Sequence, residues 1–317
     1  MTPPVLRRAL LLAGLALAYS AQASKPLVMG FSQVGAESEW RTANTASVKS
    51  AAQAAGIQLK FADAQQKQEN QVKAIRSFIA QKVDVIAFSP VVESGFETVL
   101  REAKAAKIPV ILTDRAVKVS DPSLYVTFIG SDFVEEGRKA ARWVLDQAKD
   151  GRALNIAELQ GTVGSAPAID RKKGFEEVLK ANTKLQIIRS QSGEFTRAKG
   201  KEVMEAFLKV KDGKKIDLLY AHNDDMAIGA IQAIEEAGLK PGKDILVVSI
   251  DGVRGAFEAM KAGKLNVTVE CNPLLGPQLM QLAKDVVAGK AVPKRVTVEE
   301  GVYTADQAAA ELPKRKY

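Results

Sequence analysis

Short aliphatic runs alternate with longer amphipathic segments along most of the chain. The runs at 108–112 and 245–250 are rich in β-branched residues, which favour strands buried on both faces of a parallel sheet. Between such runs, apolar residues recur at helical spacing, as Val72, Ile75 and Ile79 do. This alternation predicts an α/β fold with doubly wound parallel sheets.

The predicted elements fall into two similar halves. In each half a helix leads to a strand, a second helix and a further strand that ends in a carboxylate, Asp114 in one half and Asp251 in the other. The repeat therefore predicts two lobes with these carboxylates at equivalent points. Strands are predicted at 27–32, 57–62, 84–88, 108–113, 125–130, 154–159, 185–190, 217–221, 244–250 and 266–270, and helices at 39–55, 68–81, 95–107, 132–150, 168–180, 196–210, 224–237, 253–260 and 275–288.

The first residues have the pattern of an export signal. Arg7 and Arg8 precede an apolar stretch at 10–19, and Ala21 and Ala23 form a small-x-small cleavage pattern. The stretch is too short for a permanent membrane anchor, so we expect a signal peptide at 1–23, cleavage after Ala23 and a mature chain that is not embedded in a membrane. An apolar first helix of the fold is the alternative.

Charge and cysteine content narrow the function classes. The formal net charge is +8, but the basic residues are interleaved with acidic ones along the predicted helices, which is typical of a solvated surface and not of a nucleic-acid-binding patch. Cys271 is the only cysteine, which excludes an intramolecular disulfide. No phosphate-binding glycine motif or metal-ligand spacing occurs, so we expect neither a cofactor nor a metal.

Polar side chains gather where the predicted strands end, which is where open α/β sheets bind ligands. Asp114 and Arg115 follow one strand, Asn223 another, and Asp251 a third. Carboxylate, amide and guanidinium groups form paired hydrogen bonds with vicinal hydroxyls, and an aromatic ring such as Phe195 packs against the C–H face of a sugar. The combination predicts a carbohydrate pocket.

Several of these residues have a purely structural alternative. Asp114 and Asp251 are candidate helix N-caps, and Asp132 and Asp224 are stronger ones. Trp40 is compatible with a core position.

The sequence also leaves room for surface and catalytic roles of some residues. Arg171 lies in a run of charged residues that also fits a surface, and His222, the only histidine, is expected to be structural. Asp114 and Asp251 are also compatible with the acid and nucleophile of a hydrolase, although Arg115 favours the ionised form of Asp114 and so makes it a poor acid. We therefore expect a binding protein that is not an enzyme.

Six motifs along the chain resemble those of the periplasmic sugar-binding proteins of ABC importers, in the ribose/galactose-binding group. Three further segments are similar to the galactofuranose-binding branch of that group: GFSQVG at 30–35, DAQQKQENQ at 63–71 and SQSG at 190–193. The six group motifs are LTDR at 112–115, GSD at 130–132, ELQG at 158–161, DRKKGF at 170–175, HNDDMAIGA at 222–230 and IDG at 250–252.

The resemblance implies a type I periplasmic-binding-protein fold, in which two lobes joined by three crossovers close on one sugar. Residues 24–131 and 272–298 would form the N-terminal lobe, and 132–271 and 299–317 the C-terminal lobe. The implied sugar is galactofuranose, with ribose, arabinose or galactopyranose as alternatives. Trp40-Arg41 replaces a Phe pair of ribose binders, and Glu270-Cys271-Asn272 stands where those proteins carry a sugar-binding Gln, which disfavours ribose. Matching positions place the ligand contacts on Trp40, Arg41, Asp114, Arg115, Arg171, Phe195, Asn223 and Asp251.

The same resemblance implies a monomer in the periplasm that delivers its monosaccharide to the membrane subunits of an ABC permease.

Cleavage of the signal can be measured directly. Because the small-x-small pattern ends at Ala23, protein recovered from the periplasm should begin at Ser24. Intact-mass spectrometry of the exported protein checks this, and a mass that includes residues 1–23 would contradict it.

Overall fold

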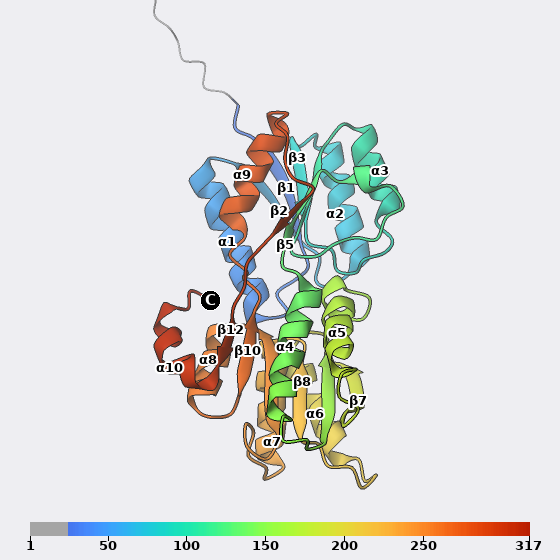
Figure 1. Cartoon of the computed structure of the whole chain (residues 1–317). Coiled ribbons are helices and arrows are strands. Elements are labelled where there is room, and N and C mark those ends of the chain that lie inside the picture. Colours follow the sequence, from blue (N-terminus) through green and yellow to red (C-terminus); the bar gives the residue numbers. More distant parts are fainter. Residues whose placement is uncertain (1–24) are drawn as a thin grey trace, which may run out of the picture.

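The computed structural model describes residues 25–317, so the cleavage site predicted after Ala23 lies outside the described residues. Two six-stranded sheets, each flanked by helices, lie one beyond the other along the molecule (Figure 1). Among the described residues, no helix is both long and apolar enough to cross a membrane. The predicted α/β fold with two lobes is confirmed.

The N-terminal sheet is entirely parallel. Alternate residues of β3 point to opposite faces, so that Val85 and Ala87 pack against α1 and α9 while Ile86 and Phe88 pack against α2 and α3. The strand order is β11 (Arg295–Thr297), β5 (Thr127–Gly130), β4 (Val110–Thr113), β3 (Val85–Phe88), β1 (Val28–Gln33) and β2 (Gln58–Asp63), and the helices are α1 (Glu39–Ala55), α2 (Gln68–Ala80), α3 (Glu97–Ala105) and α9 (Gly276–Val287).

The C-terminal sheet is parallel except for β12, which is antiparallel to β10. The chain runs directly from β11 into this sheet and enters it beside the carboxyl end of β10, so β12 runs in the opposite direction. The order is β12 (Val302–Thr304), β10 (Val267–Glu270), β9 (Leu246–Asp251), β8 (Leu218–Ala221), β6 (Leu154–Gln160) and β7 (Leu185–Ser192), and the helices are α4 (Phe133–Gln147), α5 (Ala166–Leu179), α6 (Arg197–Lys209), α7 (Asp224–Glu236), α8 (Arg254–Lys261) and α10 (Ala308–Glu311).

The chain passes between the two sheets three times, after β5, after β10 and after β11. The positions 131/132, 271/272 and 298/299 lie in these crossovers, and we propose that they divide the lobes. The elements β11, β12 and α10 have no counterpart among the predicted ones. Each is only three or four residues long, which is too short to show a hydrophobic period.

Glycines let α4 and α5 approach each other closely. A Cβ at Gly137 would lie 2.2 Å from the carbonyl oxygen of Arg171, and one at Gly174 would lie 1.9 Å from that of Val134. This contact sets the position of Arg171, because the two helices cannot separate without moving its backbone. The packing of α4 on α5 therefore fixes part of the site described below.

Gly137→Ala should force α4 and α5 apart, since the added methyl group would meet backbone atoms that cannot rotate away. We expect a loss of about 3 kcal/mol in the free energy of unfolding, measured by urea denaturation, together with weaker ligand binding. Gly213→Ala is the control, because an added Cβ meets nothing within 4 Å there and only the positive φ of 75° opposes it. Equal stability of the two variants would contradict the packing argument.

Candidate functional site

A cavity lies between the two lobes. All eight residues that the sequence placed at the ligand line this one cavity. The lining is Glu37, Ser38, Trp40, Arg41, Asp114 and Arg115 from the N-terminal lobe, Phe133, Pro167, Arg171, Phe195, Asn223 and Asp251 from the C-terminal lobe, and Cys271 from a crossover.

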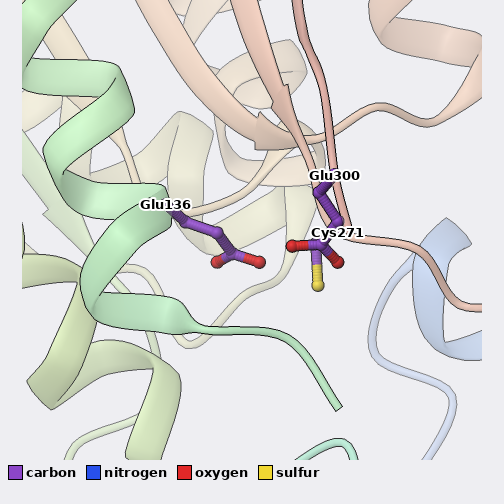
Figure 2. A group of neighbouring side chains, drawn as sticks. All are labelled: Glu136, Cys271 and Glu300. Atoms are coloured by element: carbon purple, nitrogen blue, oxygen red, sulfur yellow. The ribbon is translucent and has the colours of Figure 1, made fainter. Parts of the chain in front are cut away.

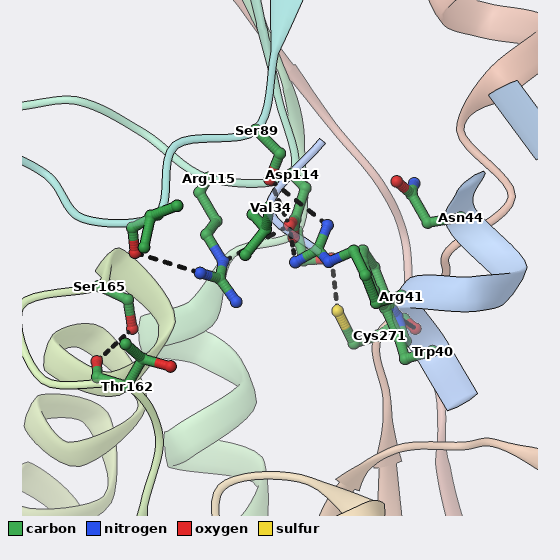
Figure 3. Close-up of polar contacts among 12 residues, drawn as sticks. Val34, Trp40, Arg41, Asn44, Ser89, Asp114, Arg115, Thr162, Ser165 and Cys271 are labelled. Carbon is green, nitrogen blue, oxygen red and sulfur yellow. Dashed lines mark hydrogen bonds and ion pairs between the residues drawn. The ribbon is translucent and has the colours of Figure 1, made fainter. Parts of the chain in front are cut away.

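Buried charges dominate the N-terminal side of the cavity (Figure 3). Arg41 lies in the first turn of α1, where the Ser38 side chain caps the helix by accepting from the Arg41 backbone N–H. Its Nη2 is 2.7 Å from Asp114 Oδ2, and Ser89 donates to the same oxygen at 2.8 Å. Burial alone would raise the pKa of Asp114, but Arg41 and Arg115 hold it below its usual value. Asp114 is therefore an ionised acceptor.

Two atoms on this side have no hydrogen-bond partner among the described residues: Glu37 Oε2 and Arg115 Nε. The other oxygen of Glu37 accepts from Arg41 Nε at 3.0 Å, and Arg115 Nη1 donates to the Val91 carbonyl at 3.2 Å. Buried polar atoms are normally paired, so one open acceptor and one open donor suit a ligand that offers both, as a polyol does.

The C-terminal side is centred on Arg171, which is only 3% exposed. Its Nε donates to Glu136 at 2.7 Å, its Nη1 donates to the His222 carbonyl at 2.5 Å, and its Nη2 lies 3.5 Å from Asp251 Oδ1. Burial raises the pKa of Asp251 well above its usual range, and Arg171 only partly opposes this shift. Arg171 is thus an interior residue, and the surface alternative for it is wrong.

The cavity residues after the strands have unusual backbone angles. The φ values are 64° at Asp114, 62° at Phe195 and 135° at Asp251, a region that side-chain-bearing residues rarely adopt. Such strain is found at functional sites, where the surrounding fold enforces it. It turns these side chains into the cavity instead of continuing the strands.

The N-cap alternatives are resolved residue by residue. Asp132 caps α4, as expected. Asp224 is not a cap; it lies inside α7 and accepts from Thr268, Ser249 and the Val253 backbone. Asn223 is the cap instead, accepting from the Met226 N–H while its amide donates to the Phe195 carbonyl.

The aromatic residues are buried but remain at the cavity surface. Trp40 is 4% exposed, and its Nε1 donates to the Cys271 carbonyl at 2.6 Å, which ties α1 to a crossover. The Arg115 guanidinium lies 5.3 Å from the centre of the Phe195 ring. The rings of Trp40 and Phe195 thus offer flat apolar surfaces beside the charged groups.

His222 is structural, in agreement with the sequence analysis. Its Nε2 lies 3.2 Å from Glu158, its Nδ1 accepts from the Gly161 N–H, and burial lowers its pKa despite the nearby Glu158 carboxylate. Its ring does not line the cavity.

Comparison with known proteins identifies the family. A family model described as "Periplasmic binding protein domain" matches residues 29–291. The chain belongs to this family. The resemblance inferred from the motifs is thereby confirmed.

Three relatives are similar to this chain over more than nine-tenths of its length. The chain is 52% identical to the "Galactofuranose-binding protein YtfQ" of Escherichia coli over 98% of each chain. It is 57% identical in sequence to a protein from Mycobacterium smegmatis whose crystal structure is described as a complex with β-D-fucofuranose. The two structures align with a TM-score of 0.90 over 92% of this chain and 95% of that one. It is 55% identical to the periplasmic binding protein component of the arabinose ABC transporter of Shewanella sp. ANA-3, bound to α- and β-L-arabinofuranose, with a TM-score of 0.88 over 91% and 95% of the two chains.

Five lining residues of this binding protein were absent from the sequence prediction: Glu37, Ser38, Phe133, Pro167 and Cys271. Glu37 carried a usable signal, since an acidic residue four positions before Arg41 forms an i,i+4 pair. Phe133 and Pro167 begin α4 and α5, so their positions depend on how the helices start. From the crossover whose contact the sequence left unresolved, Cys271 lines the cavity, while Glu270 turns away to bind Arg315 and Tyr317 of the C-terminal segment.

Asp114→Asn should weaken ligand binding about 30-fold, because a charge-assisted hydrogen bond worth about 2 kcal/mol is lost. Asn tolerates positive φ, so the backbone at this position is not strained by the change. Isothermal calorimetry measures the affinity, and Asp146→Asn on the exposed side of α4 is the control. An unchanged affinity in folded Asp114→Asn would rule out Asp114 as a ligand contact.

Proposed function

We propose that this chain is the binding component of an ABC sugar importer and that it captures a monosaccharide in the furanose form, galactofuranose first among them. The observation that supports this most strongly is the cavity lining, in which buried carboxyl and guanidinium groups from two lobes converge beside the rings of Trp40 and Phe195. The three relatives compared above are described as binding galactofuranose or as bound to fucofuranose or arabinofuranose.

The polar groups of the cavity suit a compact polyol. Arg41, Arg115 and Arg171 are donors, and the ionised Asp114 is an acceptor. Burial raises the pKa of Asp251 well above its usual range, which favours a neutral carboxyl group that donates as well as accepts. A sugar hydroxyl also does both, which lets each one bridge a donor and an acceptor of the wall.

Capture requires a movement of the lobes, because the lining residues are buried in the present closed form. Closure is held by contacts across the opening: the Glu39 N–H donates to Asp225 at 2.8 Å, and the Glu93 N–H donates to the Gly164 carbonyl at 2.9 Å. Hinge closure around a ligand is a common way for two-lobed proteins to signal occupancy. The closed face is what the permease subunits recognise.

One chain supplies every residue of the cavity lining, so we propose that the protein acts as a monomer. We further propose that the bound sugar leaves chemically unchanged. The opposite pKa shifts of Asp114 and Asp251 are also those of a glycosidase pair, but Asp114 is already engaged by two guanidinium groups and Ser89.

A thermal-shift screen of the mature protein with ring-locked glycosides tests the ring form. Methyl β-D-galactofuranoside should raise the melting temperature, because a ligand that binds only the native state stabilises it, whereas methyl β-D-galactopyranoside should not. Free L-arabinose and D-ribose complete the panel, and the protein is unfolded and refolded beforehand to remove any sugar that it carries.

Chromatography of the recovered furanoside then distinguishes capture from catalysis. A shift with the pyranoside alone would overturn the furanose assignment. Release of free galactose would overturn the binding-protein assignment.

A further inference from the structure

A cluster of two carboxyl groups and a thiol lies beside the cavity, where the crossovers meet (Figure 2). Glu136 lies on α4, Cys271 follows β10, and Glu300 lies between β11 and β12. One ligand atom of each lies within 4.8 Å of the other two; Glu136 and Cys271 are buried and Glu300 is partly buried. Two carboxylates this close repel each other when both are ionised, which favours a proton or a cation between them.

Glu136 has one oxygen without a hydrogen-bond partner among the described residues. Its Oε2 accepts from Arg171 Nε at 2.7 Å, whereas its Oε1 is buried and unpaired. The side chains of Cys271 and Glu300 both lie within hydrogen-bonding reach of Glu136. A protonated Glu300 would be the stronger donor, because a protonated carboxyl group donates one hydrogen bond and a thiol is a weak donor.

Glu300 also connects all three crossovers. Its Oε1 accepts from the Ser131 hydroxyl in the first crossover and from the Asn272 N–H in the second at 2.9 Å. Glu300 itself belongs to the third crossover, where Lys139 of α4 donates to its carbonyl at 2.7 Å. The Ser131 hydroxyl lies 3.4 Å from Cys271 Sγ, so a single side chain gathers the segments that must bend when the lobes move.

Two cavity residues depend on this arrangement. Glu136 fixes the guanidinium of Arg171, and the Cys271 carbonyl accepts from Trp40 Nε1. The cluster is thus linked on one side to the cavity wall and on the other side to the hinge.

We propose that Glu300 is a positioning residue that shares a proton with Glu136, and that this proton keeps Arg171, Trp40 and the crossovers in the closed, sugar-binding geometry. The proposal rests on the sugar binding proposed above. Glu300 does not line the cavity, so its effect reaches the ligand through the residues that it positions.

A proton explains the cluster better than a metal ion does. Arg171 already balances one carboxylate, so a neutral Glu300 leaves no uncompensated buried charge. Burial and the neighbouring Glu136 raise the pKa of Glu300 to about 9, and burial raises the pKa of the Cys271 thiol well above its usual value. A cation would instead require the ionised forms of all three groups.

The charged groups around Glu136 and Glu300 determine how sugar affinity changes with pH. Arg171 of α5 faces Glu136, and Arg295 of β11 lies on the Glu300 side; both favour ionised carboxylates. Asp251 of β9 faces Arg171 from the cavity. As the pH rises through about 9, Glu300 loses its proton and repels Glu136, so affinity should fall by up to about tenfold per pH unit, the slope for one proton.

The test is the affinity for methyl β-D-galactofuranoside between about pH 7 and pH 9.5. Glu300→Gln keeps a neutral donor and acceptor at every pH, so we expect it to lose the decline in affinity that the wild type shows. Glu299→Gln, a neighbouring exposed glutamate, and Cys271→Ser should retain that decline. Burial is the main cause that lowers the pKa of Arg115 to about 10, so Arg115 contributes the same pH dependence of affinity to every variant. The test is therefore the difference in pH dependence between the wild type and Glu300→Gln.

Equal slopes in the wild type and Glu300→Gln would overturn the proposal. So would a loss of affinity with EDTA that Zn²⁺ restores, which would assign the cluster to a metal ion.

If the wild type binds no furanoside at pH 7, the proposed function is refuted, but the shared proton is not. Melting curves of the ligand-free protein then test the shared proton. A raised folded-state pKa means that the folded state holds more protons between about 4.5 and 9, so the stability of the wild type relative to Glu300→Gln should fall as pH rises across that window. A constant difference in melting temperature would overturn the shared proton.

Discussion

The burial of charge between the lobes is the constraint on which the rest of the structure depends. Arg41, Arg115 and Arg171 are each at most 3% exposed, and an unpaired guanidinium at such a depth would cost several kcal/mol. Each therefore has a carboxylate within 4 Å: Asp114 for Arg41 and Arg115, and Glu136 for Arg171. The two partners of each pair lie on the same side of the cavity, so the fold of that side orients the donors and acceptors that a sugar would meet.

The same residue type has different chemistry in the two lobes because its neighbours differ. Asp114 touches two guanidinium groups and a hydroxyl, which keeps it ionised. Asp251 has one guanidinium at 3.5 Å and acidic neighbours at longer range, so burial prevails and its pKa lies well above the usual range. The pseudo-symmetry of the lobes therefore produces an asymmetric cavity, which a sugar with distinct faces can enter in one orientation.

The positions of the cavity residues also depend on backbone geometry and on glycines beside them. Asp114 leaves β4 with positive φ, and Gly130 on the adjacent strand leaves room for it, since a Cβ there would lie 2.7 Å from the Asp114 carbonyl oxygen. On the other lobe, a Cβ at Gly161 would lie 1.8 Å from the Phe195 ring. Glycine is thus required at positions that lie outside the cavity lining but let the lining residues approach one another.

The sequence by itself determined the α/β class, the two lobes and the strand ends on which ligand residues lie, because these follow from hydrophobic period and from the polar residues that stop each run. It also supplied, through the family motifs, eight residues that line one cavity. The tertiary structure alone decided what depends on distance between remote segments. Glu37 meets Arg115, Glu136 meets Arg171, and Glu300 reaches two other crossovers only after the lobes are assembled. The raised pKa of Asp251 belongs to this second group, because burial, which causes it, is not a property of the linear chain, whereas the lowered pKa of Asp114 followed from the adjacent Arg115.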